Sequence, residues 1–290
     1  MSIYRCLNVW HTDIRFRDIV KQKWEEYKIQ ANGMWVVKEK FKRLKHELKI
    51  WNKEVFGYTG KLKIDIIRRI GELDSLDDES NLDEKSKVER IELLSQLRVL
   101  NLKNESLLQQ KFRTKWIAYG DTNSKFFHSY IKWRSLMNNI KGLEVLGQWS
   151  EEPEIVKEAV REFYVKRLTA TPDSGVRLDN IHFQQITEED NKMLINVFDE
   201  NEIKEAVWEC GSNKSPGPDG FNFSFIKKYW DVINKEIIEF VQDFYKNGII
   251  PKGSNASFIT LVPKVENPIG LNEYRPISLV GCMYKINKKS

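Results

Sequence analysis

The sequence predicts a mainly α-helical fold with small β elements, an α+β protein built around amphipathic helices. One apolar stripe at helical spacing is formed by Val37, Phe41, Leu44, Leu48, Trp51 and Val55. A second stripe is formed by Ile226, Trp230, Ile233, Ile237, Phe240 and Phe244. Residues typical of strands gather in short runs at 138–149 and 257–262. These patterns predict long helices with one or two small β elements.

The helix predicted over residues 37–55 is rich in basic residues outside its apolar stripe. They are Lys38, Lys40, Lys42, Arg43, Lys45, Lys49 and Lys53. One interpretation is a solvated helix packed on a partner helix, and the other is a helix that also lays its lysines along phosphates. Glycine-containing residues 56–60 are expected to end it.

A helical hairpin is expected next. One helix is predicted over residues 62–73, with Ile66, Ile70 and Leu73 on one side. A second is predicted over 88–119, with Leu93, Leu97, Leu100 and Leu107 on one side. The two should pair as an antiparallel, coiled-coil-like hairpin. The acidic residues 74–87 look like a flexible connector, so we do not expect Asp77-Asp78 within it to bind a metal.

Basic and aromatic residues alternate after this hairpin, a pattern that suits backbone neutralisation and base stacking. The candidate nucleic-acid-binding residues are Lys111, Arg113, Lys115, Trp116 and Lys125. The alternative is that the aromatic side chains are core anchors and the charges are solvated. A helix should start near Ser124, capped by Asp121 or Asn123.

The following elements are shorter. Residues 138–149 predict a β-hairpin, with Gly142 and Gly147 allowing tight turns, and residues 153–168 predict a helix with Pro153 in its first turn. The helix over 200–210 should be capped by Asp199 and turn Ile203, Val207 and Trp208 inward. The helix over 226–244 should end at Asn247-Gly248. A strand over 257–262 should stop at Pro263, and Arg275-Pro276 should form an extended turn.

Residues 214–220, Lys-Ser-Pro-Gly-Pro-Asp-Gly, combine two prolines with two glycines. This composition cannot continue a helix or a central strand, so it predicts a rigid, exposed loop that launches the next helix. Asp219 lies in a Pro-Asp-Gly turn, where a turn or capping role is expected rather than a catalytic one.

Four segments follow one another in the last part of the chain: SPGPDG (215–220), LVPK (261–264), YRPISL (274–279) and GCMYK (281–285). In this order and spacing they resemble the opening of the reverse transcriptase domain of LINE-type (non-LTR) retrotransposons, most like the plant branch. Residues 116–128 (WIAYGDTNSKFFH) are similar to the basic extension that precedes the polymerase motifs in that family and is thought to hold template RNA.

The resemblance implies a partial fingers subdomain of a right-hand polymerase over 206–290. It also implies an N-terminal extension with a small β-hairpin over 131–205. Residues 1–130 would be a basic helical linker with a coiled-coil-like hairpin, after an endonuclease that would lie before Met1.

The activity implied is RNA-directed DNA synthesis, with an RNA template or RNA/DNA hybrid and dNTP as partners. Lys264 and Arg275 would contact the incoming triphosphate. The parent enzyme would need Mg²⁺, held by an Asp of a Phe-Asp motif and by an Asp-Asp pair expected beyond Lys285. We therefore expect no catalytic residue and no metal or cofactor in this chain, which should be inactive alone. Whether it acts as an enzyme stays open. The alternative is a non-enzymatic helical nucleic-acid-binding or protein-interaction module.

Charge and cysteine usage agree with a nucleic-acid partner without requiring one. The net charge is +5, and residues 1–74 hold 17 basic against 10 acidic residues, while residues 149–205 hold 7 against 14. Cys6, Cys210 and Cys282 are isolated, which predicts neither a disulfide framework nor a zinc site. The sequence shows no membrane-spanning run or signal peptide. An intracellular protein without a membrane partner is expected, in the nucleus or the cytoplasm.

Overall fold

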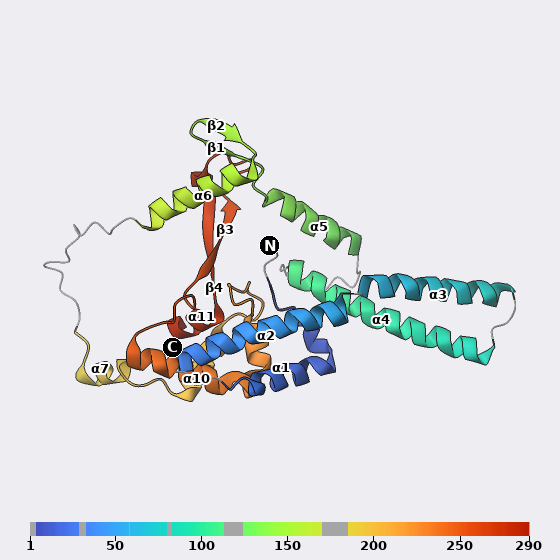
Figure 1. The fold of residues 1–290 in the computed structure, drawn as a ribbon, viewed down its shortest axis with the longest axis horizontal. Helices are drawn as coiled ribbons and strands as arrows, with labels where there is room; N and C mark the ends of the chain where they lie inside the picture. The colour runs from blue at the N-terminus through green and yellow to red at the C-terminus, as the bar shows by residue number, and fades with distance from the viewer. Residues whose placement is uncertain are drawn as a thin grey trace. The chain divides into compact units, whose positions relative to one another are not determined.

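The computed structural model describes residues 4–28, 33–57, 59–79, 83–112, 124–169 and 185–289. As predicted, it is mainly helical with small β elements (Figure 1), and the strands form two separate two-stranded sheets. Within these residues, none of the helices combines the length and the apolar character that a membrane crossing requires. Two compact units are present: 1–131 with 198–258 and 279–290 form the first, and 132–197 with 259–278 form the second.

The first unit is built on α2 (Gly33–Phe56), which packs against α10 (Trp230–Asn247). The apolar stripe predicted on α2 is confirmed as its buried face, since Val37, Leu44 and Leu48 are fully buried. On α10 the predicted stripe contributes Ile233, Ile237 and Phe240, also fully buried. Both helices are amphipathic, and burying the two apolar faces against each other removes them from water, which is the main stabilising force here.

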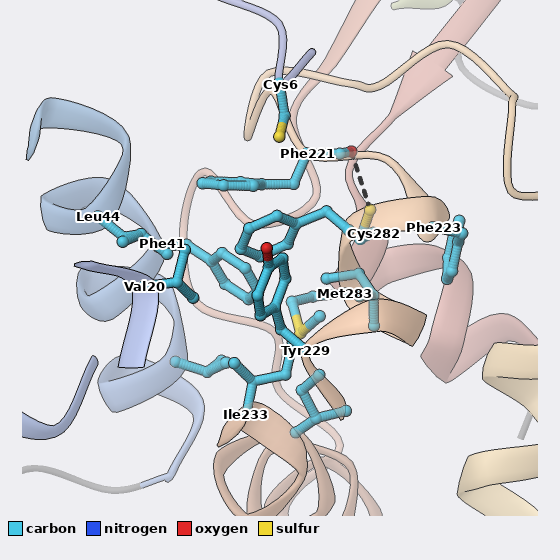
Figure 2. Close-up of a cluster of buried hydrophobic side chains, with 14 of the residues drawn as sticks. Cys6, Val20, Phe41, Leu44, Phe221, Phe223, Tyr229, Ile233, Cys282 and Met283 are labelled. Atoms are coloured by element: carbon cyan, nitrogen blue, oxygen red, sulfur yellow. Dashed lines mark hydrogen bonds between the residues drawn. The ribbon is translucent and has the colours of Figure 1, made fainter. Parts of the chain in front are cut away.

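Two N-terminal elements complete this core, and their role was not predicted. They are the 3₁₀ helix η1 (Asn8–Thr12) and the helix α1 (Ile14–Glu26). Trp10, Phe16 and Trp24 are almost fully buried, and the Phe16 and Trp51 rings lie 5.0 Å apart between centroids. Phe16, Val20 and Trp24 recur every four residues, which is a helical signal in the sequence. Figure 2 shows part of the cluster, which includes Val20 and Tyr229, and in it the Phe41 and Phe221 rings lie 5.0 Å apart between centroids.

The helix predicted over 226–244 is divided in two by Tyr229. The structure has α9 (Phe223–Lys228) and then α10, and Tyr229 between them has φ −109°. Its ring is buried against Phe225, 4.9 Å away, so burying this ring at the junction is favoured over a continuous helix. The predicted end is confirmed, because Gly248 takes a left-handed conformation with φ 65°.

Helix α8 (Glu200–Glu209) is confirmed, with Asp199 accepting a 2.8 Å hydrogen bond from the Glu202 amide. Trp208 was predicted to face inward, and this is wrong: it is 45% exposed. Its ring lies edge-on to Trp230 and under the Lys204 ammonium, at the border of the core. Two short helices were not predicted, α7 (Glu188–Leu194) and α11 (Cys282–Lys289).

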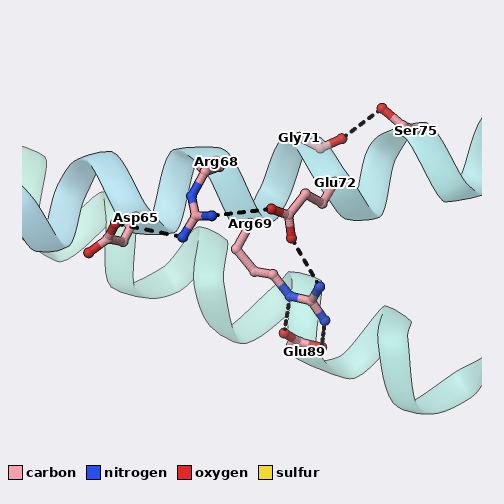
Figure 3. Close-up of polar contacts among 7 residues, drawn as sticks. All are labelled: Asp65, Arg68, Arg69, Gly71, Glu72, Ser75 and Glu89. Carbon is pink, nitrogen blue, oxygen red and sulfur yellow. Dashed lines mark hydrogen bonds and ion pairs between the residues drawn. The ribbon is translucent and has the colours of Figure 1, made fainter.

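The predicted helical hairpin is confirmed by α3 (Thr59–Glu79) and α4 (Glu84–Phe112). Arg69 of α3 binds Glu89 of α4 with two hydrogen bonds of 2.7 and 3.0 Å and also contacts Glu72 (Figure 3). Ile66, Ile70 and Leu73 are buried, as their spacing predicted. The connector is shorter than the predicted 74–87, because helix α3 continues to Glu79 and takes in Asp77-Asp78.

The second unit contains the predicted β-hairpin and the helix α6 (Pro153–Leu168), whose predicted bounds are confirmed. Strands β1 (Leu143–Val145) and β2 (Gln148–Ser150) pair antiparallel, and Leu146 and Gly147 turn between them with φ 52° and 79°. Leu143 is fully buried, and the Glu144 amide donates to the Ile269 carbonyl at 3.0 Å. The helix expected near Ser124 is α5 (Ser124–Met137), and its expected cap, Asp121 or Asn123, lies outside the described residues.

Strands β3 (Ser257–Pro263) and β4 (Tyr274–Val280) form a two-stranded ribbon. The predicted first strand is confirmed. Arg275-Pro276 was predicted to be a turn, but it lies within β4. A proline is tolerated there because each strand of a two-stranded ribbon has an edge that needs no amide donor. Most residues of β4 are exposed, including Ile277.

The two compact units divide the chain differently from the predicted segments 1–130, 131–205 and 206–290. One hydrophobic core contains residues from both chain ends, from Tyr4 to Trp51 and from Ile203 to Ile286. The first and last predicted segments therefore share a core, because α2 and α10 cover each other's apolar faces.

Candidate functional site

The Pro-Gly-Pro-Asp-Gly loop of residues 216–220 is held on three sides within the first unit. The Cys6 amide donates to the Gly220 carbonyl at 2.8 Å, and the Lys45 ammonium of α2 donates to the Pro218 carbonyl at 2.9 Å. The Cys282 amide of α11 donates to Asp219 Oδ2 at 2.5 Å. The prediction of a rigid loop agrees with these contacts. The prediction that it is exposed is wrong, since Gly217 and Gly220 are buried.

Both glycines of this loop are required by close packing. A Cβ on Gly217 would lie 2.4 Å from the Val280 carbonyl carbon, and Gly220 has φ 83°, where side chains are rarely tolerated. A Cβ on Gly220 would also lie 2.4 Å from the Tyr4 ring. The loop launches α9 as expected, because Asn222 accepts a 3.0 Å hydrogen bond from the Phe225 amide.

Asp219 has the structural role that its turn predicts, but across a long sequence distance. Its carboxylate accepts the amide of Cys282, the first residue of α11, and so satisfies an amide that has no partner inside that helix. Burial raises the pKa of Asp219, and hydrogen bonds from the Cys282, Phe221 and Gly220 amides oppose this rise. The Cys282 thiol donates to the Phe221 carbonyl at 3.1 Å, which Figure 2 shows.

A hollow of about 190 Å³ opens beside this loop. Its walls come from α2, from the loop, from residues 253–256 and from the start of α11. The basic residues that line it are Lys38, Lys42 and Lys45, and its apolar walls include Phe41 and Met283. The hollow therefore joins positive charge to an apolar surface, a combination found in sites for phosphate-bearing ligands.

Lys264 and Arg275, the predicted triphosphate contacts, lie at one end of the β3–β4 ribbon. Lys264 directly follows β3, and its amide donates to the Glu273 carbonyl at 2.8 Å, two residues before Arg275. The Lys264 ammonium donates to the Asn272 carbonyl at 2.8 Å. Both side chains are exposed. Glu273 holds the connecting loop, because its carboxylate accepts the Ile269 and Gly270 amides at 2.6 and 3.2 Å.

The side chains of the five predicted nucleic-acid contacts lie outside what the structure describes. Arg113, Lys115 and Trp116 are not among the described residues, and only the backbone of Lys111 and Lys125 is described, in α4 and α5. Their role stays a prediction.

Among the described residues, no three His, Cys, Asp or Glu side chains converge as a metal site requires.

The hollow and the Asp219–Cys282 contact were not found from the sequence. Lys38, Lys42, Lys45 and Lys49 recur at offsets 0, 4, 7 and 11, a helical stripe of basic residues that was visible in the sequence. Nothing in the sequence pairs Asp219 with an amide 63 residues away, because such a contact depends on the tertiary fold.

Comparison with known proteins gives one partial similarity. No family model matches the chain. Over 173 residues, 59% of its length, it is 25% identical to the "Transposon TX1 uncharacterized 149 kDa protein" of Xenopus laevis. The chain covers 13% of that protein's length, so it is similar to a small part of a much longer transposon protein.

Proposed function

We propose that this chain is derived from a LINE-type retrotransposon and forms the part of its RNA-directed DNA polymerase that contacts the template and the phosphates of the incoming dNTP. The proposal rests on the ordered series of segments SPGPDG, LVPK, YRPISL and GCMYK. Two cations of this series, Lys264 and Arg275, lie at one end of the β3–β4 ribbon. The similarity to a transposon protein supports the transposon origin.

The position of the two cations suits phosphate binding. Both side chains are exposed. Lys264 directly follows β3, and Arg275 is the second residue of β4. Because the two strands pair with each other, their hydrogen bonds fix the backbone that carries both cations. The Arg275 guanidinium offers a planar fork for phosphate oxygens, and the Lys264 ammonium offers a point charge. Glu273 is occupied by two backbone amides, which leaves its carboxylate less able to compete with a phosphate.

The test is nucleotide and RNA binding by the full chain. Binding of a fluorescent dATP analogue and of a labelled 20-nucleotide RNA is followed by anisotropy over a salt series. We expect Lys264→Ala/Arg275→Ala to weaken binding of the dATP analogue at least tenfold. The matched control is Lys157→Ala/Arg161→Ala, which removes two exposed cations of α6 in the same unit, each 69% exposed and paired within its own helix.

Three results decide the proposal. Loss of dATP binding in the first variant and not in the control supports it. Salt-dependent RNA binding together with dATP binding that is unchanged by Lys264→Ala/Arg275→Ala favours the alternative, a non-enzymatic nucleic-acid-binding module. A chain that binds neither ligand at low salt contradicts the proposal. Primer extension on an RNA template checks the separate expectation that the chain alone is inactive, which dNTP incorporation would overturn.

A further inference from the structure

Four lysines of α2 share one face of the helix. At about 100° per residue, Lys38, Lys42, Lys45 and Lys49 fall within roughly 60° of arc and extend about 16 Å along the axis. We call these four residues the α2 lysine stripe. It borders the buried face of Val37, Phe41, Leu44 and Leu48, so the rigid packing of that face fixes the direction in which the lysines leave the helix.

The stripe contrasts with Lys40 on the same helix. Lys40 was grouped with the basic residues outside the apolar stripe, but it is buried, pairs with Glu236 and lies over the Trp24 ring. The charge of Lys40 is therefore neutralised by Glu236 inside the first unit. The stripe lysines keep their charge available in another way: Lys38 and Lys45 donate to the carbonyls of Lys252 and Pro218, which hold the side chains without neutralising them.

Positive charge dominates the surface around the stripe. Lys42 is 73% exposed, and its nearest carboxylate oxygen, on Glu39, is 3.4 Å away and belongs to a carboxylate shared with Arg43. Lys49 is exposed over the Tyr4 ring, 5.8 Å from its centroid. Burial, and next the neighbouring Lys49, lower the pKa of Lys45, so like charges are crowded here. A bound polyanion would relieve this repulsion.

Two hollows flank the stripe, and both are lined by Lys42 and Lys45. One is the hollow beside the 216–220 loop, with apolar walls from Phe41 and Met283. The other is shallow, about 440 Å³, and is also lined by Tyr27, Arg43 and His46, with the carboxylates of Glu39 and Glu47 at its border. At the start of the helix Trp35 is 48% exposed, with Lys38 above its ring. Aromatic and apolar walls beside cations are what unstacked bases need.

We propose that the α2 lysine stripe binds the phosphate backbone of a single-stranded nucleic acid, whose bases enter the two flanking hollows. A stacked strand has about one phosphate per 3.4 Å, so the stripe can face roughly five phosphates. The half-exposed Trp35 ring and the partly exposed Tyr27 ring favour a single strand over a duplex, whose bases are enclosed. The inference rests on the proposed function and adds a second contact surface, located in the first unit rather than on the ribbon.

The test uses the full chain and three labelled 20-mers: single-stranded RNA, single-stranded DNA and the DNA duplex. Lys42→Ala/Lys49→Ala removes the two most solvated stripe lysines and spares those that hold loops. We expect single-strand affinity to fall roughly twentyfold at 0.1 M salt and the slope of log K against log salt to decrease by about 1.4, because two lysine–phosphate ion pairs no longer form. Lys42→Arg/Lys49→Arg should retain both values.

The matched control is Lys21→Ala/Lys235→Ala, which removes two exposed lysines from α1 and α10 and should leave the slope unchanged. Far-UV circular dichroism confirms that each variant is folded. An unchanged affinity and slope in Lys42→Ala/Lys49→Ala overturns the stripe, and tighter binding of the duplex than of either single strand overturns the choice of ligand. The RNA and DNA arms identify which strand is preferred.

The experiments can overturn the proposed function and the α2 lysine stripe independently of each other. If the wild-type chain binds RNA and the stripe variant binds it equally well, only this inference is overturned. If the stripe variant loses RNA binding but Lys264→Ala/Arg275→Ala leaves dATP binding intact, the stripe is supported and the proposed triphosphate site on the ribbon is overturned.

Discussion

Asp219 Oδ2 accepts a 2.5 Å hydrogen bond from the backbone amide of Cys282, 63 residues further along the chain. This contact joins the Pro-Gly-Pro-Asp-Gly loop to the first turn of α11, and two of the four segments that carry the family resemblance therefore meet there. The carboxylate is held by the fold, and its role here is to cap a helix.

Replacing Asp219 should change how stability depends on pH. Burial raises the folded-state pKa of Asp219 above its unfolded value of 3.8, so the folded state favours the neutral acid. The stability that this provides is present below pH 3.8 and is lost as pH rises through the folded pKa. Asp219→Asn, which stays neutral, should therefore gain stability relative to the wild type as pH rises from 4 to 8. Urea unfolding at each pH measures this difference, and Asp18→Asn on α1 controls for net charge. A constant difference would contradict the prediction.

The two loop glycines should be sensitive to the smallest side chain. Gly220→Ala combines a left-handed φ with a clash against Tyr4, and Gly217→Ala places its Cβ against the Val280 backbone. We expect each to cost about 2 kcal/mol or more in free energy of unfolding. Gly71→Ala is the matched control, because a Cβ there meets no atom within 4 Å inside α3 and should stabilise by about 0.5–1 kcal/mol. Thermal melts give the ranking, and equal effects at positions 71 and 220 would refute it.

His11 should weaken the fold in mild acid. It is packed among Phe16, Phe225 and Tyr229, and burial, followed by the Lys228 charge, lowers its pKa from 6.5 to about 4. As pH falls, His11 of the unfolded chain is therefore protonated at a higher pH than His11 of the folded chain. Stability is complete above pH 6.5 and declines as pH falls toward 4, by roughly 2–3 kcal/mol.

His11→Phe, which keeps a ring and cannot titrate, should flatten this decline. Urea unfolding between pH 4 and 7.5 is the measurement. His46→Phe, at an exposed position of α2, is the control. A wild-type curve without a decline in this interval would show that His11 is not held neutral.

The buried ion pair between Lys40 and Glu236 should give a large coupling free energy in a double-mutant comparison. Lys40 pairs with Glu236, whose second oxygen accepts the Trp24 indole N–H at 3.0 Å. Lys40→Met leaves a buried carboxylate unpaired and should cost about 3–5 kcal/mol in free energy of unfolding. Lys40→Met/Glu236→Gln should recover most of this loss, because the amide oxygen still accepts from Trp24.

Chemical denaturation of the single and double variants gives the coupling between the two side chains. Arg17→Met breaks an exposed pair with Asp231 and should cost less than about 1 kcal/mol. Additive effects of the Lys40 and Glu236 changes would mean that the two charges do not compensate each other.

The features that the sequence predicted correctly are those that follow from the spacing of apolar residues or from a glycine within a short segment. The buried face of α2, the hairpin of α3 and α4, the turn at Gly147 and the helix end at Gly248 follow from spacing or from glycine conformation. These features depend on residues close in the sequence, so a pattern can reveal them.

Features that depend on a distant partner were missed or mistaken. Trp208 has an apolar ring at an inward-looking position, yet Trp230 meets it at the edge of the core. Tyr229 separates α9 from α10 although the apolar period continues across it, and its ring is buried against Phe225 and Phe16. Lys40 is charged but buried, since Glu236 lies 196 residues away in the chain and next to it in the fold. Such pairs are decided by tertiary packing, which overrides local preference.

The shared core of the two chain ends has a consequence for biosynthesis. The aromatic face of α2 is translated early, but α10, which covers it, is complete only at residue 247. At about 5–20 residues per second, the ribosome needs roughly 10–40 seconds to add the 191 residues that separate Phe56 from Asn247. During that interval the Tyr4, Phe16 and Phe41 rings lack Phe221 and Tyr229, against which they pack in the fold, so the nascent chain exposes apolar surface that a chaperone could cover until its second half emerges.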